Sequence, residues 1–378
     1  MATTTRSPEC TATMVTTLFV ALELGSTRWQ LACAVAHGRP PRMRSVRAHD
    51  LAALGQEIAT AKTRFGLAAA APVRSCYEAG RDGFWLHRAL LTQGITNVVV
   101  DPASIAVDRR RRRAKSDRLD ARALVTQLMN AVAGDRRGWR EVRVPSVEAE
   151  ADRQLSREWD AVLADRTRVR NRMQGLLITQ GIRMPLTRGF ESRLAEARMW
   201  DGRALPPALL ARLRREWTHL GHVDARLAEL RRAWRARIRA ADRVGEQARQ
   251  LTGLRAIGVT GALTLTTELF AWRAFQNGRQ IGGLVGLTPT PHRSDQIVRE
   301  QGISGQGSRR LRALSIELAW AWLRWQPQST LSRWFAARFG THQRARRIGI
   351  VAVARKLLIA LWRYLDQGLV PEGAVLRG

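Results

Sequence analysis

"TLFVALELG" (residues 17–25) and "RWQLACAVA" (28–36) are two apolar runs that only a Gly-Ser-Thr turn separates. Such a pair predicts a β-hairpin. Residues 42–48 are a candidate third strand, and Asp50 follows as the expected N-cap of a helix that ends near Phe65. The chain is therefore expected to begin with an antiparallel sheet.

Strands and helices are expected to alternate from there to about residue 133. "APVRSCYEAG" (71–80) is a candidate strand that ends in an acid, and "ITNVVVDP" (95–102) is a candidate buried strand stopped by proline. A helix pattern with a terminal glycine lies between them (82–94), and another helix pattern begins at Asp117. A hairpin followed by strand, helix, strand and helix is the element order of a ribonuclease-H-like mixed α/β sheet.

Four acids have defined places in this plan. Glu23 is near the end of the first strand, Glu78 ends a later strand, and Asp117 and Asp120 are about one helical turn apart. Four carboxylates at one sheet edge repel one another unless a divalent cation lies between them, and Mg²⁺ or Mn²⁺ takes such oxygen ligands. The pattern predicts a metal site for phosphoryl transfer. The alternative is that Glu23 caps a hairpin and the two aspartates begin an ordinary helix, where the dipole favours acids.

The stretch "RRRRRAKSDRLDARAL" (109–124) places six cations immediately before the two aspartates. The whole chain of 378 residues has 63 Lys and Arg against 32 Asp and Glu, a net charge of +31. This charge favours a nucleic acid as partner, because guanidinium groups bind phosphate in bidentate fashion. The residues expected to contact nucleic acid are Arg109, Arg110, Arg111, Arg112, Arg113, Lys115, Gly258, Arg293, Arg299, Arg309 and Arg310.

Composition excludes several other classes of protein. Hydrophobic residues make up 45% of the chain, too many for a disordered basic tail. Three scattered cysteines have no metal-ligand spacing and indicate a reducing cytoplasm and no zinc finger. No run approaches the roughly 20 apolar residues of a membrane span. Residues 1–17 are expected to be a disordered tail, with either Met1 or Met14 as the true start.

The middle of the chain, residues 146–248, is expected to be a helical hairpin or coiled coil. Apolar residues recur every three or four positions in two long segments, 155–176 and 209–234, and arginines occupy the other faces. This region could be an internal strut, or a dimerisation arm whose arginines also hold nucleic acid. The sequence alone leaves both interpretations open.

Residues 249–370 are expected to form a mainly α-helical C-terminal domain. The run 251–269 has apolar helix patterns on both sides of Gly258, like a helix-hairpin-helix, whose turn exposes backbone N–H groups to phosphate. Residues 288–308 are polar and turn-rich between helices, and are expected to be a functional loop. Ser294 in this segment is a candidate exposed hydroxyl, with a plain surface position as the alternative.

Together these motifs resemble the IS110 family of bacterial insertion-sequence transposases, relatives of the Piv DNA invertases. "VALELGS", "CYEAGRDGFW" and "AKSDRLDARAL" resemble the acid motifs of that family, and "GLTPTPHRSDQIVREQGISGQGSRRLRAL" resembles its C-terminal signature. The resemblance covers about residues 17–361. It implies a RuvC-like metal-binding domain (18–140), a coiled-coil linker (146–248) and a C-terminal transposase domain with a nucleophilic serine (249–370).

The resemblance also implies roles and partners. The metal-binding tetrad would be Glu23, Glu78, Asp117 and Asp120, and the nucleophile would be Ser294. The protein would act as a dimer or tetramer on element ends and target DNA, guided by a structured bridge RNA. It would work in the bacterial cytoplasm, associated with the nucleoid. Ser294 would form a phosphoserine link that conserves the bond for rejoining, with metal assistance and with Arg293 or Arg299 neutralising phosphoryl oxygens.

Two positions depart from the family pattern. The first acid is Glu23, where Asp is usual, and its extra methylene shifts the carboxylate. Asp295 follows the serine, where many relatives have Gly, which leaves Ser304 as a rival nucleophile. Tetrad and serine are far apart in sequence, so they must meet by folding or by pairing of subunits.

Two other functions remain open from the sequence. A metal-dependent nuclease of the junction-resolving kind would use the same acids with water as nucleophile, and would leave no protein–DNA link. A non-catalytic RNA- or DNA-binding protein would bind in a salt-sensitive way without breaking strands.

Overall fold

The computed structural model describes residues 16–104, 117–294, 297–340 and 342–377, with the backbone alone for 290–301. The chain divides into two compact units, one that ends at Val144 and one that begins at Pro145. The predicted arginine run 109–113 and Lys115 lie outside the described residues. Both candidate start positions, Met1 and Met14, lie outside them as well, as does the predicted tail up to residue 15.

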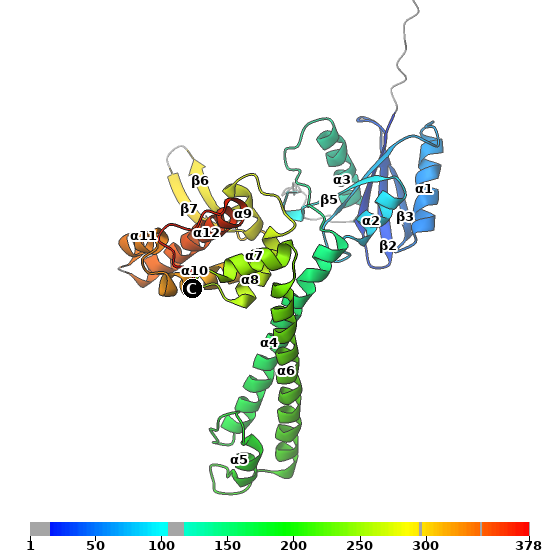
Figure 1. Ribbon diagram of the computed structural model, residues 1–378. Helices are drawn as coiled ribbons and strands as arrows, with labels where there is room; N and C mark the ends of the chain where they lie inside the picture. Colours follow the sequence, from blue (N-terminus) through cyan, green and yellow to red (C-terminus); the bar gives the residue numbers. More distant parts are fainter. Residues whose placement is uncertain (1–15, 105–116, 295–296, 341, 378) are drawn as a thin grey trace, which may run out of the picture. The chain divides into compact units, whose positions relative to one another are not determined.

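The first unit is built on a five-stranded sheet of order β3-β2-β1-β4-β5 (Figure 1). The first three strands pair antiparallel, and β4 and β5 continue the sheet parallel to β1. The strands are β1 Leu18–Leu24, β2 Arg28–Ala34, β3 Arg42–Arg47, β4 Val73–Glu78 and β5 Thr96–Val100. This is the mixed sheet that the element order predicts, and the prediction is confirmed strand by strand.

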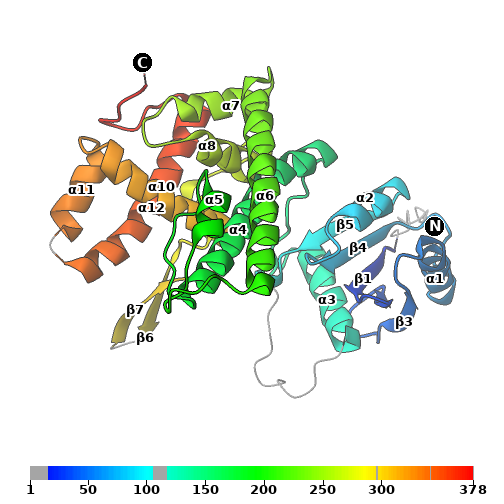
Figure 2. The same cartoon turned by 90° about the horizontal axis from the view of Figure 1, so that it is seen from below.

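Helices cover both faces of this sheet (Figure 2). On one face α1 (Leu51–Arg64) and α2 (Trp85–Thr92) contribute to a core that includes the fully buried Trp29 and Tyr77 of the sheet. On the other face α3 (Asp117–Val132) packs on β1 and β2. Alternate residues of each strand point to opposite faces, so the sheet supplies one set of side chains to each layer.

Small side chains on the second face let α3 lie close to the sheet. The cluster beneath the helix contains Ala21, Ala32 and Ala34 from the strands, and Leu124 from the helix. The two described cysteines, Cys33 and Cys76, are free and buried. Burial raises the pKa of the Cys33 thiol to about 12 and also raises that of Cys76, so both stay protonated at neutral pH.

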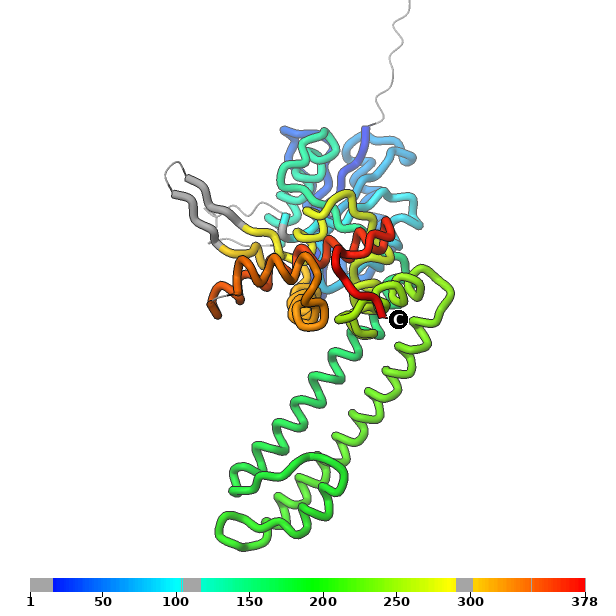
Figure 3. Tube along the Cα trace, turned by 60° about the vertical axis from the view of Figure 1, so that its left-hand side comes forward, coloured from blue at the N-terminus to red at the C-terminus, as the bar shows by residue number. Residues whose placement is uncertain are grey.

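The second unit begins with two long antiparallel helices that form an arm (Figure 3). The helices are α4 (Val147–Ile178) and α6 (Pro207–Arg239), and the short α5 (Phe190–Glu196) lies in the connection between them. Their apolar positions are buried against one another, as the three-to-four spacing predicts. Supercoiling of the pair and its use in dimerisation stay predictions.

Ion pairs fix the register of the arm helices. Arg237 binds Asp152 at 2.8 Å at one end, and Arg172 binds Glu216 at 2.6 Å towards the other. These pairs join residues 85 and 44 positions apart in the chain. A share of the arginines predicted to line the arm therefore serves its internal packing.

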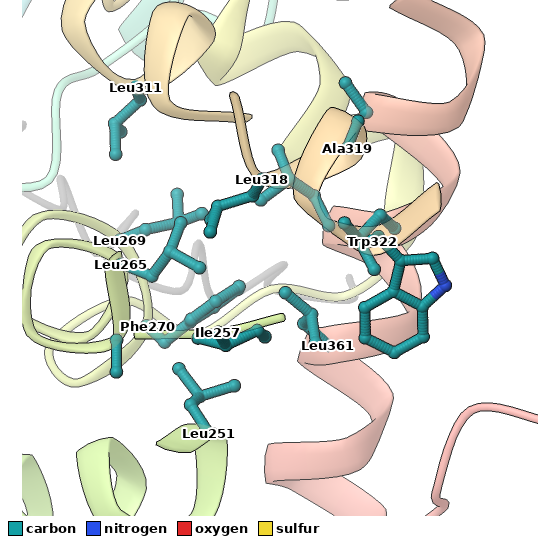
Figure 4. Close-up of a cluster of buried hydrophobic side chains, with 14 of the residues drawn as sticks. Leu251, Ile257, Leu265, Leu269, Phe270, Leu311, Leu318, Ala319, Trp322 and Leu361 are labelled. Atoms are coloured by element: carbon teal, nitrogen blue, oxygen red, sulfur yellow. The ribbon is translucent and has the colours of Figure 1, made fainter. Parts of the chain in front are cut away.

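The remaining helices form the largest apolar core of the chain, drawn in part in Figure 4. They are α7 Arg243–Thr252, α8 Val259–Leu265, α9 Gly278–Val285, α10 Arg309–Trp325, α11 Thr330–Phe339 and α12 Gln343–Gln367. A π-helical turn, η3 (Thr266–Phe270), continues α8. The helix-hairpin-helix around Gly258 stays a prediction, as does the division of this unit into a linker and a separate domain. No helix among the described residues is long and apolar enough to cross a bilayer.

A cluster of charged groups joins the arm to this core. The carboxylate of Glu268, 9% exposed, accepts from Arg157 at 2.8 Å and from Arg310 at 2.7 Å. Arg310 also donates to the carbonyl oxygen of Ser156 at 2.8 Å and pairs with Asp160. The hydrogen bond that Arg157 donates to Glu268 raises the pKa of the Arg157 guanidinium. Because buried carboxylates need such partners, the cluster ties α4, η3 and α10 together.

The segment between α9 and α10 is a β-hairpin, so the prediction of an irregular loop over 288–308 is wrong. Strands β6 (Pro289–Ser294) and β7 (Ile297–Ile303) pair antiparallel with a register shift near Pro289 (Figure 1). The two prolines of β6, Pro289 and Pro291, made the segment look irregular. Proline is tolerated in a two-stranded sheet, because each strand there has an edge without a partner.

Candidate functional site

Two of the four predicted acids stand side by side at one edge of the sheet. Strands β1 and β4 pair in parallel through Leu22 and Tyr77, and Glu23 and Glu78 are the next residue of each strand. Directly opposed residues in a parallel pair point to the same face. That face carries α3, because Ala21 and Cys76, two residues earlier, lie in the core beneath that helix.

The other two acids lie at the end of α3 that covers this edge. The Sγ atom of Cys76 is 4.0 Å from the carbonyl oxygen of Leu124. Towards its C-terminus the helix lines a hollow with Arg74 and Thr96, where β4 and β5 begin. The helix therefore runs against these strands. Four helical residues, from Leu124 back to Asp120, cover about 6 Å, as two residues of strand do.

Asp117 and Asp120 thus begin α3 beside the strand ends that carry Glu23 and Glu78. Asp117 is exposed and Asp120 half-buried. The carboxyl ends of parallel strands in an open α/β sheet are where ligands generally bind. The topology places all four predicted acids at this one edge, although Glu23 and Asp120 are 97 positions apart in the sequence.

The four acids are close in the fold but are not closed into a ligand shell. Among the residues that the structure describes, no group of three or more His, Cys, Asp or Glu side chains is near enough to hold an ion together. The donor set itself, four carboxylates at one sheet edge, fits Mg²⁺ or Mn²⁺. We call Glu23, Glu78, Asp117 and Asp120 the acidic edge.

One acid near the acidic edge was not among the predicted site residues. Asp101 directly follows β5, the third parallel strand, and its carboxylate lies 3.4 Å from the Arg140 guanidinium. In the sequence, Asp101 is recognisable only as the end of a candidate strand stopped by Pro102. The signal was available, because Glu78 is the last residue of one buried strand and Asp101 directly follows its neighbour.

The β6–β7 hairpin of the second unit is a separate candidate region. Ser294 is the last residue of β6 and pairs with Ile297, so it stands next to the turn. Ser304 follows β7, and its N–H donates to the carbonyl oxygen of Thr288 at 2.9 Å. The two serines therefore lie at opposite ends of the hairpin, about six residues or roughly 20 Å apart.

Two glycines lock the base of this hairpin against α9 and α10. Gly286 ends α9 with φ of 72°, and a Cβ there would overlap the carbonyl oxygen of Gln306. Gly307 has φ of 86°, and a Cβ there would overlap the carbonyl oxygen of Leu284. The N–H of Ser308 donates to that same oxygen at 3.0 Å. The backbones thus approach more closely than any side chain allows, and the hairpin has a fixed base.

Gly286→Ala is expected to loosen the hairpin. Left-handed backbone costs an L-residue about 1–2 kcal/mol, and overlap in a packed site costs about 1–3 kcal/mol more. Amide hydrogens of β7 should then exchange about a hundredfold faster, measured by hydrogen–deuterium exchange with mass spectrometry. Gly283→Ala is the matched control, because its Cβ would meet nothing within 4 Å. Equal exchange in both variants would show that the base is not held at Gly286.

The predicted nucleic-acid contacts have different surroundings. Arg309 and Gly258 are exposed at the starts of α10 and α8. Arg293 and Arg299 belong to β6 and β7, where His292 pairs with Arg299. Arg310 is different, because its guanidinium is engaged by Glu268 and Asp160 within the protein. We therefore leave Arg310 out of the nucleic-acid surface.

Comparisons with known proteins match the stretches of sequence that contain the hairpin and most of the acidic edge. Residues 32–180 match the family model for DEDD transposases of the IS110 type, and residues 248–332 match the model described as "Transposase IS116/IS110/IS902 family". The first match contains three residues of the acidic edge, and the second contains the whole β6–β7 hairpin.

Full-length relatives agree with the family matches. The chain is 40% identical over 377 residues to the inferred transposase y4rJ of Sinorhizobium fredii (strain NGR234), which covers 95% of this chain and 94% of the relative. It is 28% identical over 258 residues to the transposase for insertion sequence element IS1328 of Yersinia enterocolitica, covering 68% of this chain and 73% of that one.

Proposed function

The chain belongs to the IS116/IS110/IS902 family of transposases, enzymes that cut and rejoin DNA, and we propose that it does so through a covalent serine–DNA intermediate. In this proposal the acidic edge holds Mg²⁺ or Mn²⁺, and Ser294 is the nucleophile. The observation that carries it is the meeting of Glu23, Glu78 and the start of α3 at one sheet edge. Four carboxylates at this edge would bind the divalent cation that assists phosphoryl transfer.

The serine step exchanges one phosphate ester for another. The Ser294 oxygen bonds to phosphorus, and the bond from phosphorus to the 3′ oxygen of the DNA breaks. The serine loses its proton to a base, and the departing 3′ oxygen gains one. Because the number of phosphate ester bonds is unchanged, the strand can later be rejoined without ATP.

Protein groups supply orientation and charge for this step. A divalent cation at the acidic edge would polarise the phosphate and stabilise the departing oxygen. Arg293 or Arg299, on the same hairpin as Ser294, would neutralise the phosphoryl oxygens. Arg109, Arg110, Arg111, Arg112, Arg113 and Lys115 would draw the nucleic-acid backbone towards Asp117.

We propose DNA and RNA as partners. The substrates are the element ends and the target DNA, and a structured guide RNA supplies sequence specificity by base pairing. The net charge of +31 supports binding of both backbones. We also propose a homodimer or homotetramer, with the α4–α6 arm as the candidate contact between protomers.

A covalent-capture assay tests the reaction. Full-length protein is mixed with Mg²⁺, with RNA transcribed from the non-coding DNA that flanks the gene, and with labelled element-junction DNA, and is run on a denaturing gel. We expect a protein–DNA band with Mg²⁺ and none with EDTA. Cleavage without such a band would replace the proposal by hydrolysis with water as nucleophile. Binding without any strand breakage would indicate a non-catalytic protein.

A further inference from the structure

A cavity lies between α11, α12 and the C-terminal tail. Its lining contains no residue of the β6–β7 hairpin or of the acidic edge. Its volume is about 510 Å³. Ligand sites for small molecules usually measure about 300–1,000 Å³. The lining includes Trp322, Ser329, Leu331, Trp334, Lys356, Ile359, Ala360, Arg363 and Glu372. None of these residues has a part in the proposed reaction.

The floor of the cavity is formed by buried residues of its lining, among them Trp322 and Ser329. Trp322 is fully buried, and its indole N–H donates to the Ser329 hydroxyl oxygen at 2.9 Å. The Ser329 hydroxyl in turn donates to the carbonyl oxygen of Gln326 at 2.9 Å. Figure 4 shows Trp322 at the margin of the large apolar core. Because these polar groups are satisfied inside the protein, the floor favours an apolar, flat group.

The tail wall of the cavity is held in place. Gln326, 1% exposed, donates to the carbonyl oxygen of Val375 at 2.9 Å and accepts from its N–H at 2.8 Å. Gly373 has φ of 71°, and a Cβ there would lie 2.7 Å from the carbonyl oxygen of Gln328. The N–H of Thr330 donates to the carbonyl oxygen of Glu372 at 3.1 Å. The cavity is therefore preformed and does not depend on a loose tail.

An aromatic ring and two cations flank the opening. The Lys356 ammonium lies 4.8 Å from the centre of the Trp334 ring, a cation–π distance. Arg363 follows Lys356 by two helical turns on α12, so both cations lie on the same side of that helix. Both are exposed, and Glu372 is the one acid in the lining. The charge therefore suits an anionic ligand with a flat apolar part.

We propose that this cavity binds one unpaired nucleotide of the nucleic acid on which the protein acts. The base enters the slot beside Trp334 and over the apolar floor, and its phosphate meets Lys356 and Arg363. Aromatic platforms with neighbouring cations bind single strands in this way, at roughly 1–3 kcal/mol per stacked base. The inference goes beyond the proposed function, because base capture needs neither the acidic edge nor Ser294.

Equilibrium binding to two probes tests the proposal. One probe is a labelled single strand of about ten thymidines, the other is a strand of equal length and charge with abasic sites, and each is also made as RNA. Binding is measured by fluorescence anisotropy at one fixed salt concentration in EDTA, so that no cleavage occurs. We expect the strand with bases to bind at least about tenfold more tightly. The ratio of the affinities for the strand with bases and the abasic strand is compared between the RNA and DNA probes. The larger ratio assigns the site to RNA or to DNA.

Two substitutions locate the effect. Ala360→Trp fills the slot and should bring the base-to-abasic ratio close to one, while Ala337→Trp on the exposed side of α11 should leave it unchanged. Lys356→Gln should weaken both probes equally, because it removes a phosphate contact. Strands with 5-iodouracil should crosslink on irradiation to a peptide that contains Trp334.

Three outcomes would overturn this assignment. An equal affinity of the wild type for both probes would exclude base binding. A base-to-abasic ratio that survives in Ala360→Trp would place base binding elsewhere. A change of oligomeric state in Ala360→Trp with that ratio intact would identify the cavity as an interface between copies of the chain. None of these outcomes affects the capture reaction, so the two proposals fail separately.

Discussion

Ser294→Ala is expected to abolish the covalent protein–DNA product, whereas Ser304→Ala should retain it. Ser294→Ala removes the oxygen that forms the link in this proposal, so the rate should fall by roughly 10⁴-fold or more. The two serines are separated by the length of the hairpin, so they cannot serve the same phosphate without a large rearrangement. The measurement is the capture assay with labelled junction DNA.

The surroundings of the two serines favour Ser294. Its place next to the hairpin turn allows a phosphodiester to approach without disturbing the packed base. Ser304 belongs to that base, where it is half-buried and where its N–H is bonded to Thr288. Attack from Ser304 would require the contacts around Gly286 to open.

Binding of RNA and junction DNA must be measured together with covalent capture, so that a loss of the reaction is distinguished from a loss of binding. Ser294→Ala should bind RNA and junction DNA as the wild type does, because only the reaction is removed. A band that persists in Ser294→Ala and disappears in Ser304→Ala would move the nucleophile to the base of the hairpin. Loss of binding in Ser294→Ala would show that the variant fails at nucleic-acid binding, before the step in which the serine would act as nucleophile.

The first unit could be predicted closely because its elements carry strong local signals. Runs of apolar residues bounded by turns set β1, β2, β4 and β5, and Asp50 caps α1 by accepting from the N–H of Ala53 at 2.8 Å. The acidic edge followed from the same signals, because Glu23 and Glu78 close their strands. What the sequence could not supply was register. The offset that places Glu23 beside Glu78 depends on pairing across 55 residues.

The hairpin that carries Ser294 was not predicted, because its strands are rich in polar residues and β6 contains two prolines. The sequences PTPHRS and IVREQGI do not alternate apolar and polar residues regularly, and such alternation is the main signal for a strand. The available signal was two extended runs separated by only Asp295 and Gln296. The glycines on either side, Gly286 and Gly307, mark close backbone approach, but only the fold shows what they approach.

Arg310 shows the same limit for charge. In the sequence it is one arginine of a basic stretch, indistinguishable from Arg309 beside it. Its partners Asp160 and Glu268 are 150 and 42 residues away in the chain. A pattern of charges therefore predicts a basic surface, but it cannot tell which cations are used inside the fold.

Asp120→Asn and Asp117→Asn are expected to lower the rate of strand capture by about 10³-fold or more. A metal ion in phosphoryl transfer contributes several kcal/mol of charge stabilisation, and each 1.36 kcal/mol corresponds to a factor of about ten. Asparagine keeps the size of the side chain but removes the charge that binds a hard cation. The rate is followed as the appearance of the covalent band at saturating DNA.

A second readout separates metal binding from the helix dipole. Both aspartates also stabilise the start of α3, an effect of about 0.3–1 kcal/mol that asparagine partly preserves. Mn²⁺ binding, measured by calorimetry on the protein without nucleic acid, should be lost in both variants. Asp135→Asn is the control, because Asp135 lies beyond the far end of α3 and pairs with the exposed Arg137. If Mn²⁺ binding and capture were unchanged in Asp117→Asn and Asp120→Asn, the two aspartates would only stabilise the start of α3. The proposal of a metal ion at the acidic edge would then be wrong.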